Sequence, residues 1–308
     1  MSELKPVIVI LAVHNGLRWL AEQAASILRQ ESVYVSLLIN VDNSTDGSEA
    51  WCKALAARDE RVRVLPTGHS FGSASANFFH LLTQFENPDR LAVALADQDD
   101  IWLQGKLIRA LDILDSGGYA GYSSNVIAFW PDGRNALIHK AQPQRELDYL
   151  FEAAGPGCTY LLSADLVEQV QRLWRERPLL MAQIKHHDWF IYALARSLNL
   201  PWFIDPLPQV YYRQHEANEL GVNRGLRPLL YRAQTVCGGS AWQQVTLLVE
   251  TLFDSAIQAP IQPPQSSADF FRLGLKAGQC RRRRLDQFWF FCSCLLMALL
   301  RMRIRPTS

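Results

Sequence analysis

Short apolar segments alternate with amphipathic helical patterns through the first third of the 308-residue chain. The segments expected to form strands are rich in β-branched residues and span 7–13, 33–41, 62–65 and 91–96. The segments with helical periodicity span 17–30, 44–57 and 74–85. Strands that alternate with helices are joined by crossover connections. The sequence therefore predicts an α/β fold in which helices flank a mostly parallel, Rossmann-like sheet.

The pattern changes in the second part of the chain. Residues 119–130 predict a longer strand, 164–176 and 188–198 predict helices, and 201–205 and 209–213 predict two short strands. Beyond about residue 225 the pattern is mostly helical. We therefore expect one domain over residues 1–224, with halves of about 1–118 and 119–224, and a helical extension over residues 225–308.

Composition excludes several classes of protein. The net charge of +1 creates no field that would attract nucleic acid, so we expect no nucleic-acid partner. The six cysteines form no CxxC pair and no cluster with zinc spacing, and we expect reduced thiols in a cytoplasmic protein. The first apolar run fits a buried strand better than a signal peptide. The glycine fingerprints of P-loop and dinucleotide-binding proteins are absent, as is the GxSxG motif of hydrolases.

Three carboxylates follow the fourth predicted strand within four residues, in the sequence Asp97-Gln98-Asp99-Asp100. Like charges this close repel one another, and a divalent cation would relieve that repulsion. Hard cations such as Mg²⁺ and Mn²⁺ prefer oxygen ligands and commonly bridge carboxylates and a diphosphate. The simpler alternative is a solvated acidic turn that caps a helix beginning near Trp102. The position after a buried strand favours the metal site.

The segment DQDDIW at 97–102 resembles the signature of family 2 glycosyltransferases, particularly the rhamnosyltransferase-like branch. Other segments agree with this family in order and spacing: HNG at 14–16, DNSTDGS at 42–48, FG at 71–72 with NF at 77–78, GCT at 157–159, HDW at 187–189 and YRQH at 212–215. The resemblance covers about residues 6–220 and implies a GT-A fold. Two positions depart from the family pattern: His14 replaces the usual tyrosine, and Asn43 replaces the second aspartate of the DDGS loop.

The resemblance implies that the first half of the domain holds a nucleotide-diphosphate sugar. Asp42 would accept a hydrogen bond from N3–H of uracil or thymine. Asp97 would bond the ribose or the sugar, and Arg213 would bind the diphosphate through its planar guanidinium. The other residues expected to line the nucleotide-sugar site are His14, Asn15, Asn43, Asn77 and Gln98. The alternatives are a polar loop for His14 and Asn15, and an ordering role in its own helix for Asn77.

The resemblance also implies a Mg²⁺ or Mn²⁺ ion that offsets the charge building on the departing diphosphate. Asp99 is the first candidate ligand, together with Asp97. His215 is a further candidate, and a surface loop is the alternative for the segment that contains it. We expect Asp100 to cap a helix or to orient its neighbours.

The resemblance gives Asp188 the role of the base that removes the proton of the acceptor hydroxyl during an inverting displacement. A carboxylate beside an aromatic ring loses part of its hydration, which suits this role. The alternative is an N-cap for the helix that follows. Gly157, Cys158 and Trp189 would lie on the acceptor side, with Cys158 as a small packing residue rather than a nucleophile.

The expected reaction is transfer of a sugar, best matched to L-rhamnose from dTDP-L-rhamnose, to a saccharide or polyprenyl-diphosphate-linked saccharide in the synthesis of a surface polysaccharide such as O-antigen. A UDP-hexose donor, a non-catalytic sugar-nucleotide or glycan-binding module and a membrane-surface scaffold are the alternatives. An apolar segment at 288–300 lies between arginines at 281–284 and at 301, 303 and 305. It is shorter than the about 20 residues of a membrane span, and its arginines fit contact with the cytoplasmic face of the inner membrane. Burial against its own domain or in a dimer is the alternative.

Overall fold

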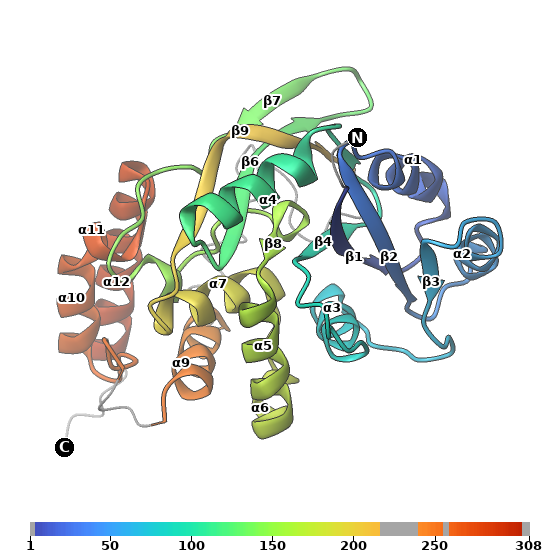
Figure 1. Ribbon diagram of the computed structural model, residues 1–308. Helices are drawn as coiled ribbons and strands as arrows, with labels where there is room; N and C mark the ends of the chain where they lie inside the picture. Colours follow the sequence, from blue (N-terminus) through green and yellow to red (C-terminus); the bar gives the residue numbers. More distant parts are fainter. Residues whose placement is uncertain (1–3, 216–239, 255–258, 304–308) are drawn as a thin grey trace. The chain divides into compact units, whose positions relative to one another are not determined.

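The computed structural model describes residues 4–215, 240–254 and 259–303 (Figure 1). The chain divides into two compact units. The first contains Met1–Ala141 and Ala154–Gly221, and the second contains Gln142–Ala153 and Val222–Ser308. The boundary expected at residue 224 lies outside the described residues. A short segment from the middle of the chain thus belongs to the C-terminal unit, which the sequence pattern does not indicate.

A mixed sheet forms the centre of the first unit, in the order β3-β2-β1-β4-β8-β6-β9-β5, with β7 paired to β6. The strands of its parallel part are β1 (Lys5–Val13), β2 (Val33–Val41), β3 (Val62–Val64) and β4 (Val93–Asp97). The remaining strands are β5 (Ile101–Trp102), β6 (Gly121–Phe129), β7 (Asn135–Ile138), β8 (Leu161–Leu162) and β9 (Trp202–Arg213). The predicted α/β fold is confirmed.

Helices cover both faces of this sheet. On one face lie α1 (Leu17–Leu28), α2 (Ser48–Ala56) and α4 (Lys106–Gly117); on the other, α3 (Ala74–Thr83), α5 (Ala164–Glu176) and α7 (His187–Ser197) pack against one another (Figure 1). The Ser73 and Ser163 side chains cap α3 and α5 by accepting a backbone N–H of the first turn. Short helices complete the unit at η2 (Gly157–Thr159) and α6 (Pro178–Met181).

The strands β1, β2 and β4 are apolar on both faces because helices cover both sides of the sheet. Their burial explains why these elements could be predicted from continuous apolar runs. The two short strands expected at 201–205 and 209–213 form one strand, β9. Its register with β6 shifts between Ser124 and Val126, and this irregularity accommodates the two prolines in the middle of β9.

The second unit contains η1 (Asp148–Leu150), α9 (Ser240–Leu252), α10 (Ser267–Leu275), α11 (Ala277–Cys280) and α12 (Arg284–Arg303). Helices α10 and α12 pack closely at Gly274, where an added Cβ would lie 3.1 Å from Cβ of Cys294 and 3.3 Å from Cδ2 of Phe291. Among the described helices, none combines the length and the apolar character needed to cross a membrane. The described cysteines are free thiols, and Cys237 lies outside the described residues.

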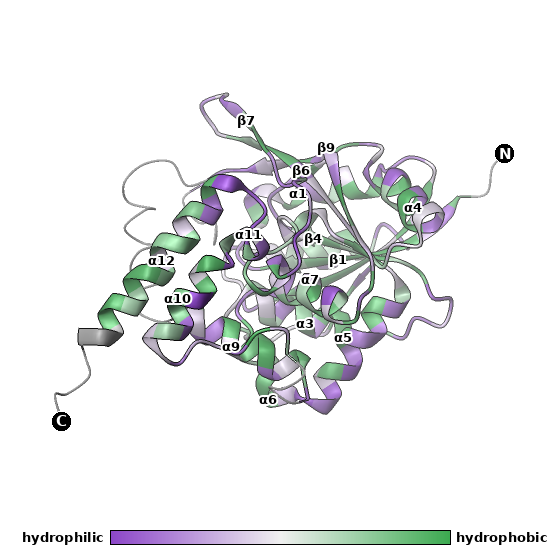
Figure 2. Cartoon of the chain, turned by 90° about the vertical axis from the view of Figure 1, so that its left-hand side faces the viewer, coloured by the Kyte–Doolittle hydropathy of each residue, from purple (hydrophilic) through white to green (hydrophobic). Residues whose placement is uncertain are grey.

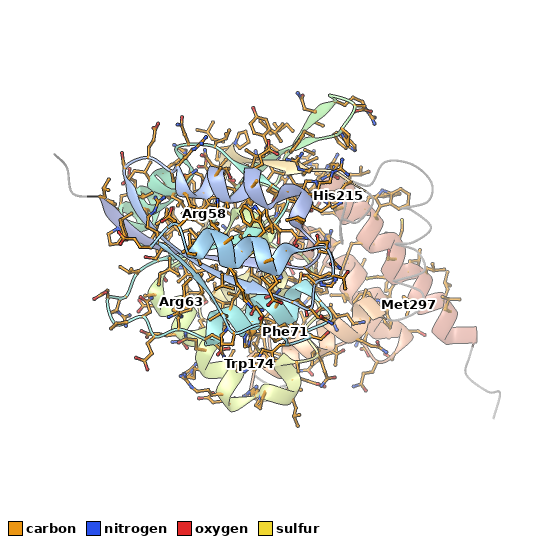
Figure 3. The ribbon with its side chains drawn as sticks, turned by 90° about the vertical axis from the view of Figure 1, so that its right-hand side faces the viewer. Arg58, Arg63, Phe71, Trp174, His215 and Met297 are labelled. Atoms are coloured by element: carbon orange, nitrogen blue, oxygen red, sulfur yellow. The ribbon has the colours of Figure 1, made fainter. Side chains whose placement is uncertain are left out.

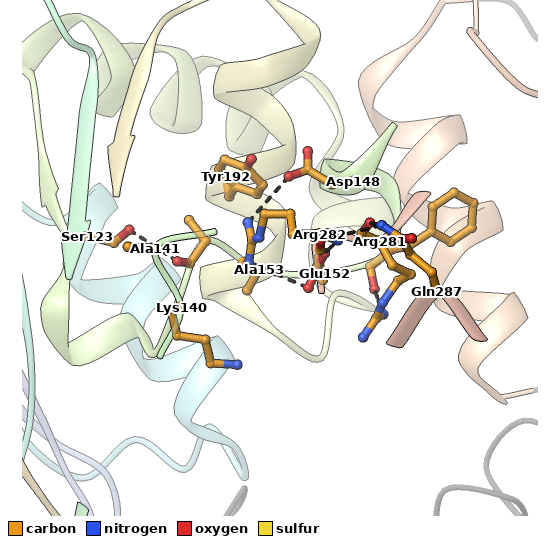
Figure 4. Close-up of polar contacts among 12 residues, drawn as sticks. Ser123, Lys140, Ala141, Asp148, Glu152, Ala153, Tyr192, Arg281, Arg282 and Gln287 are labelled. Atoms are coloured by element: carbon orange, nitrogen blue, oxygen red, sulfur yellow. Dashed lines mark hydrogen bonds and ion pairs between the residues drawn. The ribbon is translucent and has the colours of Figure 1, made fainter. Parts of the chain in front are cut away.

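A buried arginine joins the two sequence segments of the second unit (Figure 4). The guanidinium of Arg282 lies 3.4 Å from the carboxylate of Asp148 and 3.6 Å from that of Glu152, and it donates to the carbonyl of Ala153 at 2.5 Å. The side chains of Arg282 and Asp148 are almost completely buried. The buried charge of Arg282 is therefore compensated by two carboxylates, of which Asp148 is itself buried.

We expect Arg282→Met to destabilise the second unit by about 3–5 kcal/mol, because it leaves the carboxylate of Asp148 buried without its counter-charge. The neighbouring Arg283 is exposed and is the matched control. Arg283→Met should change the free energy of unfolding by less than about 0.5 kcal/mol. Urea denaturation of both variants measures the difference, and equal stability of the two would contradict a structural role for this buried pair.

Candidate active site

The carboxyl ends of three parallel strands meet at one edge of the sheet. Ala12 of β1 pairs with Asp97 of β4, and Val13 pairs with Val41 of β2. The segments that follow these strands begin at His14, Asp42 and Gln98. Apart from Asn77, which lies in α3, the nucleotide-site residues predicted in the first half of the domain lie in or next to these segments, and the structure brings the segments together.

The segments after β1 and β2 are joined by hydrogen bonds. Asn15 adopts a left-handed backbone conformation, with φ of 48°, which asparagine tolerates better than most residues. Its side-chain oxygen accepts the N–H of Thr45 at 2.8 Å, and its own N–H donates to the hydroxyl of Ser44 at 3.0 Å. The N–H of Leu17 donates to the carboxylate of Asp46 at 2.9 Å. Asn15 thus shapes the rim of the site through its conformation.

Gln98 connects the ends of β1 and β4. Its side-chain oxygen accepts the N–H of His14 at 2.8 Å, and its side-chain nitrogen donates to the carbonyl of His14 at 2.9 Å. A Cβ at Gly16 would lie 2.1 Å from the Gln98 oxygen, so a side chain there would displace the Gln98 amide from the backbone of His14. The amide of Gln98 is therefore engaged with the backbone, while the side chain of His14 is exposed at the edge.

Asp42 and Asn77 are buried beneath the rim of the site. The carboxylate of Asp42 accepts the N–H groups of Asn43, Phe71 and Gly72 at 2.8, 2.9 and 3.1 Å, which orders the segment leading to α3. The side-chain oxygen of Asn77 accepts a hydrogen bond from Asn40 at 2.8 Å. This contact joins α3 to β2, and both roles that the sequence offered for Asn77 stay predictions. Contact of Asp42 or Asn77 with a nucleotide remains a prediction.

Asp99 meets His215 at the end of β9. The imidazole Nε2 of His215 lies 2.6 Å from a carboxylate oxygen of Asp99, and the His215 ring stacks on Trp19 of α1 with ring centroids 4.3 Å apart. Figure 3 shows His215 beside α1. The two candidate metal ligands, 116 positions apart in the sequence, are thus in direct contact.

Arg213 connects the segment that follows β4 to helix α1. Its Nε donates to the carbonyl of Asp99 at 2.8 Å, its backbone N–H donates to the carboxylate of Asp100 at 3.1 Å, and its guanidinium pairs with Glu22. Sequence analysis did not select Glu22, because an isolated acidic residue on a helix carries no signal for such a contact. Binding of a diphosphate by Arg213 remains a prediction.

Asp100 points inward, whereas Asp99 and Asp97 are partly exposed. Burial, followed by the negative charge of Asp99, raises the pKa of Asp100 to about 8. One oxygen of each carboxylate of Asp97 and Asp100 and the sulfur of Cys158 lie within 4.8 Å of one another. Burial raises the pKa of the Cys158 thiol well above its ordinary value, so this cysteine is a protonated packing residue rather than a nucleophile.

The structure assembles the predicted metal ligands only in part. Asp99 and His215 are in contact and offer oxygen and nitrogen ligands of the kind that Mn²⁺ and Mg²⁺ accept. The carboxylate of Asp97 instead lies in the group with Asp100 and Cys158, and among the described residues Asp99 and His215 are not part of that group. The buried second oxygen of Asp100 has no hydrogen-bond partner in the structure, so the cluster carries more acceptors than its own donors satisfy.

The short helix η2 links Asp188 to this cluster, because its consecutive residues Gly157 and Cys158 lie close to Asp188 and to the carboxylates, respectively. A Cβ at Gly157 would lie 2.6 Å from Nε2 of His187 and 3.4 Å from Cβ of Asp188. The sulfur of the next residue, Cys158, lies within 4.8 Å of a carboxylate oxygen of Asp97 and of Asp100. The predicted base, acceptor segment and carboxylate cluster therefore form one continuous region.

Asp188 occupies the first turn of α7, whose N-cap is His186, and its carboxylate accepts the N–H of Trp189 at 2.7 Å. It is partly exposed. The preceding His187 stacks on Phe78 with centroids 4.1 Å apart, and burial lowers its pKa to about 4. The imidazole of His187 is therefore neutral near pH 7, and its ring packs on Phe78 at the start of the helix that contains Asp188.

Solved structures with the same architecture define the class of fold. The Staphylococcus aureus protein TarS, residues 1–349, superposes with a TM-score of 0.55 at 12% identity, over 95% of this chain and 80% of that one. Its complex with UDP-GlcNAc gives a TM-score of 0.52 at 12% identity, over 96% and 92% of the two chains. At this identity the likeness establishes the fold alone, and it agrees with the expected GT-A architecture.

Comparison of sequences identifies the family. The model of "Glycosyl transferase family 2" matches residues 8–156. The dTDP-rhamnosyl transferase RfbG of Shigella flexneri is 34% identical over 287 residues, which cover 93% of this chain and 99% of that protein. The Escherichia coli UDP-Glc:alpha-D-GlcNAc-diphosphoundecaprenol beta-1,3-glucosyltransferase WfgD is 23% identical over 154 residues, which cover 49% of this chain and 57% of that protein. The chain belongs to glycosyl transferase family 2.

Proposed function

We propose that this glycosyltransferase transfers L-rhamnose from dTDP-L-rhamnose to a hydroxyl of a saccharide or polyprenyl-diphosphate-linked saccharide, in the synthesis of a surface polysaccharide. The observation that carries the donor assignment is the similarity to dTDP-rhamnosyl transferase RfbG, which extends over 99% of that protein. The similarity to the UDP-glucose enzyme extends over 57% of its length at lower identity, and a UDP-hexose donor is the competing assignment.

The nucleotide would bind at the edge formed by the ends of β1, β2 and β4. Asp42 would accept the N3–H of thymine in addition to the backbone groups that it already holds, because each carboxylate oxygen has two acceptor positions. His14 and Asn43 are exposed at the rim and would contact the base or ribose. Asp97, which is partly exposed, would bond the ribose or the sugar.

Asp99, Asp97 and His215 would hold Mn²⁺ or Mg²⁺, and the bound cation would offset negative charge on the leaving diphosphate. Arg213 would add its guanidinium on the same side. The stacking of His215 on Trp19 and the ion pair of Arg213 with Glu22 keep both side chains oriented before substrate arrives. Such preorganisation lowers the cost of ordering side chains during the reaction.

Asp188 would accept the proton of the acceptor hydroxyl as its oxygen attacks the anomeric carbon from the face opposite the diphosphate. One carboxylate acting as base in a single displacement gives inversion at that carbon. Gly157 lies against Asp188, and Trp189 is partly exposed beside it, so an acceptor sugar would pack along these residues. Cys158 contributes by packing between this segment and the carboxylates.

A panel of nucleotide sugars tests the donor assignment. With Mn²⁺ present, we expect dTDP-L-rhamnose to raise the melting temperature of the protein more than UDP-glucose or UDP-GlcNAc at the same concentration, because tighter binding to the native state stabilises it more. Turnover should follow the same order. Stronger stabilisation and faster transfer with a UDP-hexose would reject rhamnose, and the absence of transfer with any donor would favour a binding module.

Asp188→Asn tests the catalytic base. We expect the rate of transfer to fall by about a hundredfold to ten-thousandfold, with donor binding retained, because the amide cannot accept the proton. Asp165→Asn is the matched control, since Asp165 has the same first-turn position in α5 and is exposed away from the cluster. If both variants lose activity equally, the effect of Asp188 is that of a charge at a helix N-terminus.

We also propose that α12 rests on the cytoplasmic face of the inner membrane. Exposed apolar side chains recur along one side of this helix: Leu285, Phe288, Trp289, Leu295, Leu296 and Leu299. The opposite side contains the buried Cys294, Met297 and Ala298. Figure 2 shows the apolar character along the helix. Exposed Arg283 and Arg284 at its start and Arg272 and Lys276 of the neighbouring segment favour an anionic lipid surface over an uncharged partner.

Vesicle sedimentation tests this surface. We expect the protein to bind vesicles that contain phosphatidylglycerol, and the double variant Phe288→Ser/Trp289→Ser to bind about tenfold more weakly or less, because two large apolar side chains no longer enter the interface. The control is Leu137→Ser/Leu207→Ser, which removes exposed apolar side chains from the first unit. Equal binding of both variants, or a change of oligomeric state with the first alone, would reject the lipid surface.

A further inference from the structure

Gly157 occupies a position where the backbone does not require glycine. It begins η2, and its φ lies outside the left-handed region that favours this residue. The space around it explains the absence of a side chain, because an added Cβ would lie 2.6 Å from Nε2 of His187 and 3.4 Å from Cβ of Asp188. Two consecutive residues at the start of α7 therefore pack against the place that a side chain at position 157 would occupy.

The imidazole of His187 has little freedom to give way to such a side chain. It is 9% exposed and stacks on Phe78 of α3, with ring centroids 4.1 Å apart and an angle of 27° between the ring planes. Phe78 is itself fully buried. The buried Nε2 of His187 makes no hydrogen bond with any described residue, so its approach to Gly157 is a packing contact. Because protein interiors are close-packed, a ring held in this way moves only if its neighbours also move.

The residues that follow Gly157 are anchored to the strand that carries the carboxylates. The carbonyl of Tyr160 accepts the N–H of Leu95 of β4 at 3.1 Å, and the sulfur of Cys158 lies within 4.8 Å of a carboxylate oxygen of Asp97. The packing therefore leads from β4 to α7 through two consecutive residues of η2. How closely α7 approaches the carboxylates depends on how closely it approaches Gly157.

We propose that Gly157 and His187 form a positioning contact, in which the imidazole fills the space left by the missing side chain and so sets the distance between Asp188 and the carboxylates that follow β4. The inference rests on the proposed role of Asp188 as the base. It adds to the predicted contact of Gly157 with the acceptor a role in placing that base. Neither Gly157 nor His187 exchanges a proton in the reaction, and both act through Asp188.

Hydrolysis of the donor tests the inference without an acceptor sugar. Water then takes the place of the acceptor hydroxyl, and release of dTDP from dTDP-L-rhamnose measures the rate. We expect Gly157→Ala to lower kcat about tenfold to a hundredfold with an unchanged KM for the donor, because a displaced base loses its alignment. If Gly157 served only to contact the acceptor, the variant would hydrolyse the donor at the native rate, and that result would overturn the inference.

Removal of the histidine ring tests whether the two residues act through each other. In the double variant Gly157→Ala/His187→Ala the added methyl group meets no imidazole, so the loss of activity should be clearly smaller than the product of the two single effects. Effects that multiply would overturn the inference. If Gly157→Ala alone fails to fold, recovery of the folded protein in the double variant supports the contact, and an unfolded double variant overturns it.

Gly105→Ala is the matched control. Gly105 has a φ of −90°, and no described atom outside its chain neighbours lies within 4 Å of an added Cβ. This variant should keep the native kcat and the native signals of the His187 ring.

The NMR signals of the His187 ring supply a readout besides activity. In Gly157→Ala we expect the pKa of His187 to rise from about 4 toward the ordinary histidine value, because a displaced ring regains water. Unchanged ring signals and an unchanged pKa in this variant would overturn the inference. If the native protein releases no dTDP while the ring responds as expected, the proposed function fails and the packing contact stands, which distinguishes the two failures.

Discussion

Asp97, Asp99 and Asp100 carry like charges within four residues, at a place where water reaches them only in part. The structure turns Asp99 away from the other two. Asp99 contacts His215, whereas Asp100 points into the core toward the N–H of Arg213 and lies within 4.8 Å of Asp97. Gln98, between Asp97 and Asp99, binds the backbone of His14. Two sets of contacts maintain this arrangement. Gly16 lies close to Gln98, and α1 contacts the end of β9 through the stacking of Trp19 on His215 and the ion pair of Glu22 with Arg213.

The same cluster connects the two sides of the proposed reaction. Residues 157–159 are placed by the antiparallel strand β8, which pairs with both β4 and β6 and so carries Cys158 against the carboxylates. Gly157 then brings the start of α7, and with it Asp188, to the adjoining position. The residues predicted to bind donor and acceptor come from distant parts of the sequence and lie in adjoining positions, as a direct displacement would require.

The second unit has a different physical organisation. The buried Arg282 ties the segment 142–153 to the C-terminal helices through two carboxylates and a carbonyl. Helix α12 is apolar on the side that packs against α10 and again on an exposed side. Only one of these two apolar sides is buried within the unit. The other is exposed, and it is the basis for proposing contact with a lipid surface.

The parallel part of the sheet and its flanking helices could be predicted from the residues alone, because strands buried on both faces are continuous apolar runs and amphipathic helices have a period of about 3.6 residues. The resemblance of ordered motifs to family 2 glycosyltransferases is confirmed by the relative that is 34% identical. The folded chain was needed to see which acidic residue faces inward, that His215 meets Asp99, and that Lys106 is buried beside Trp102. It also decided that β9 is one strand and that residues 142–153 join the C-terminal unit. These features depend on contacts between residues about a hundred positions apart, or on the direction of single side chains, and neither leaves a periodic signal in the chain.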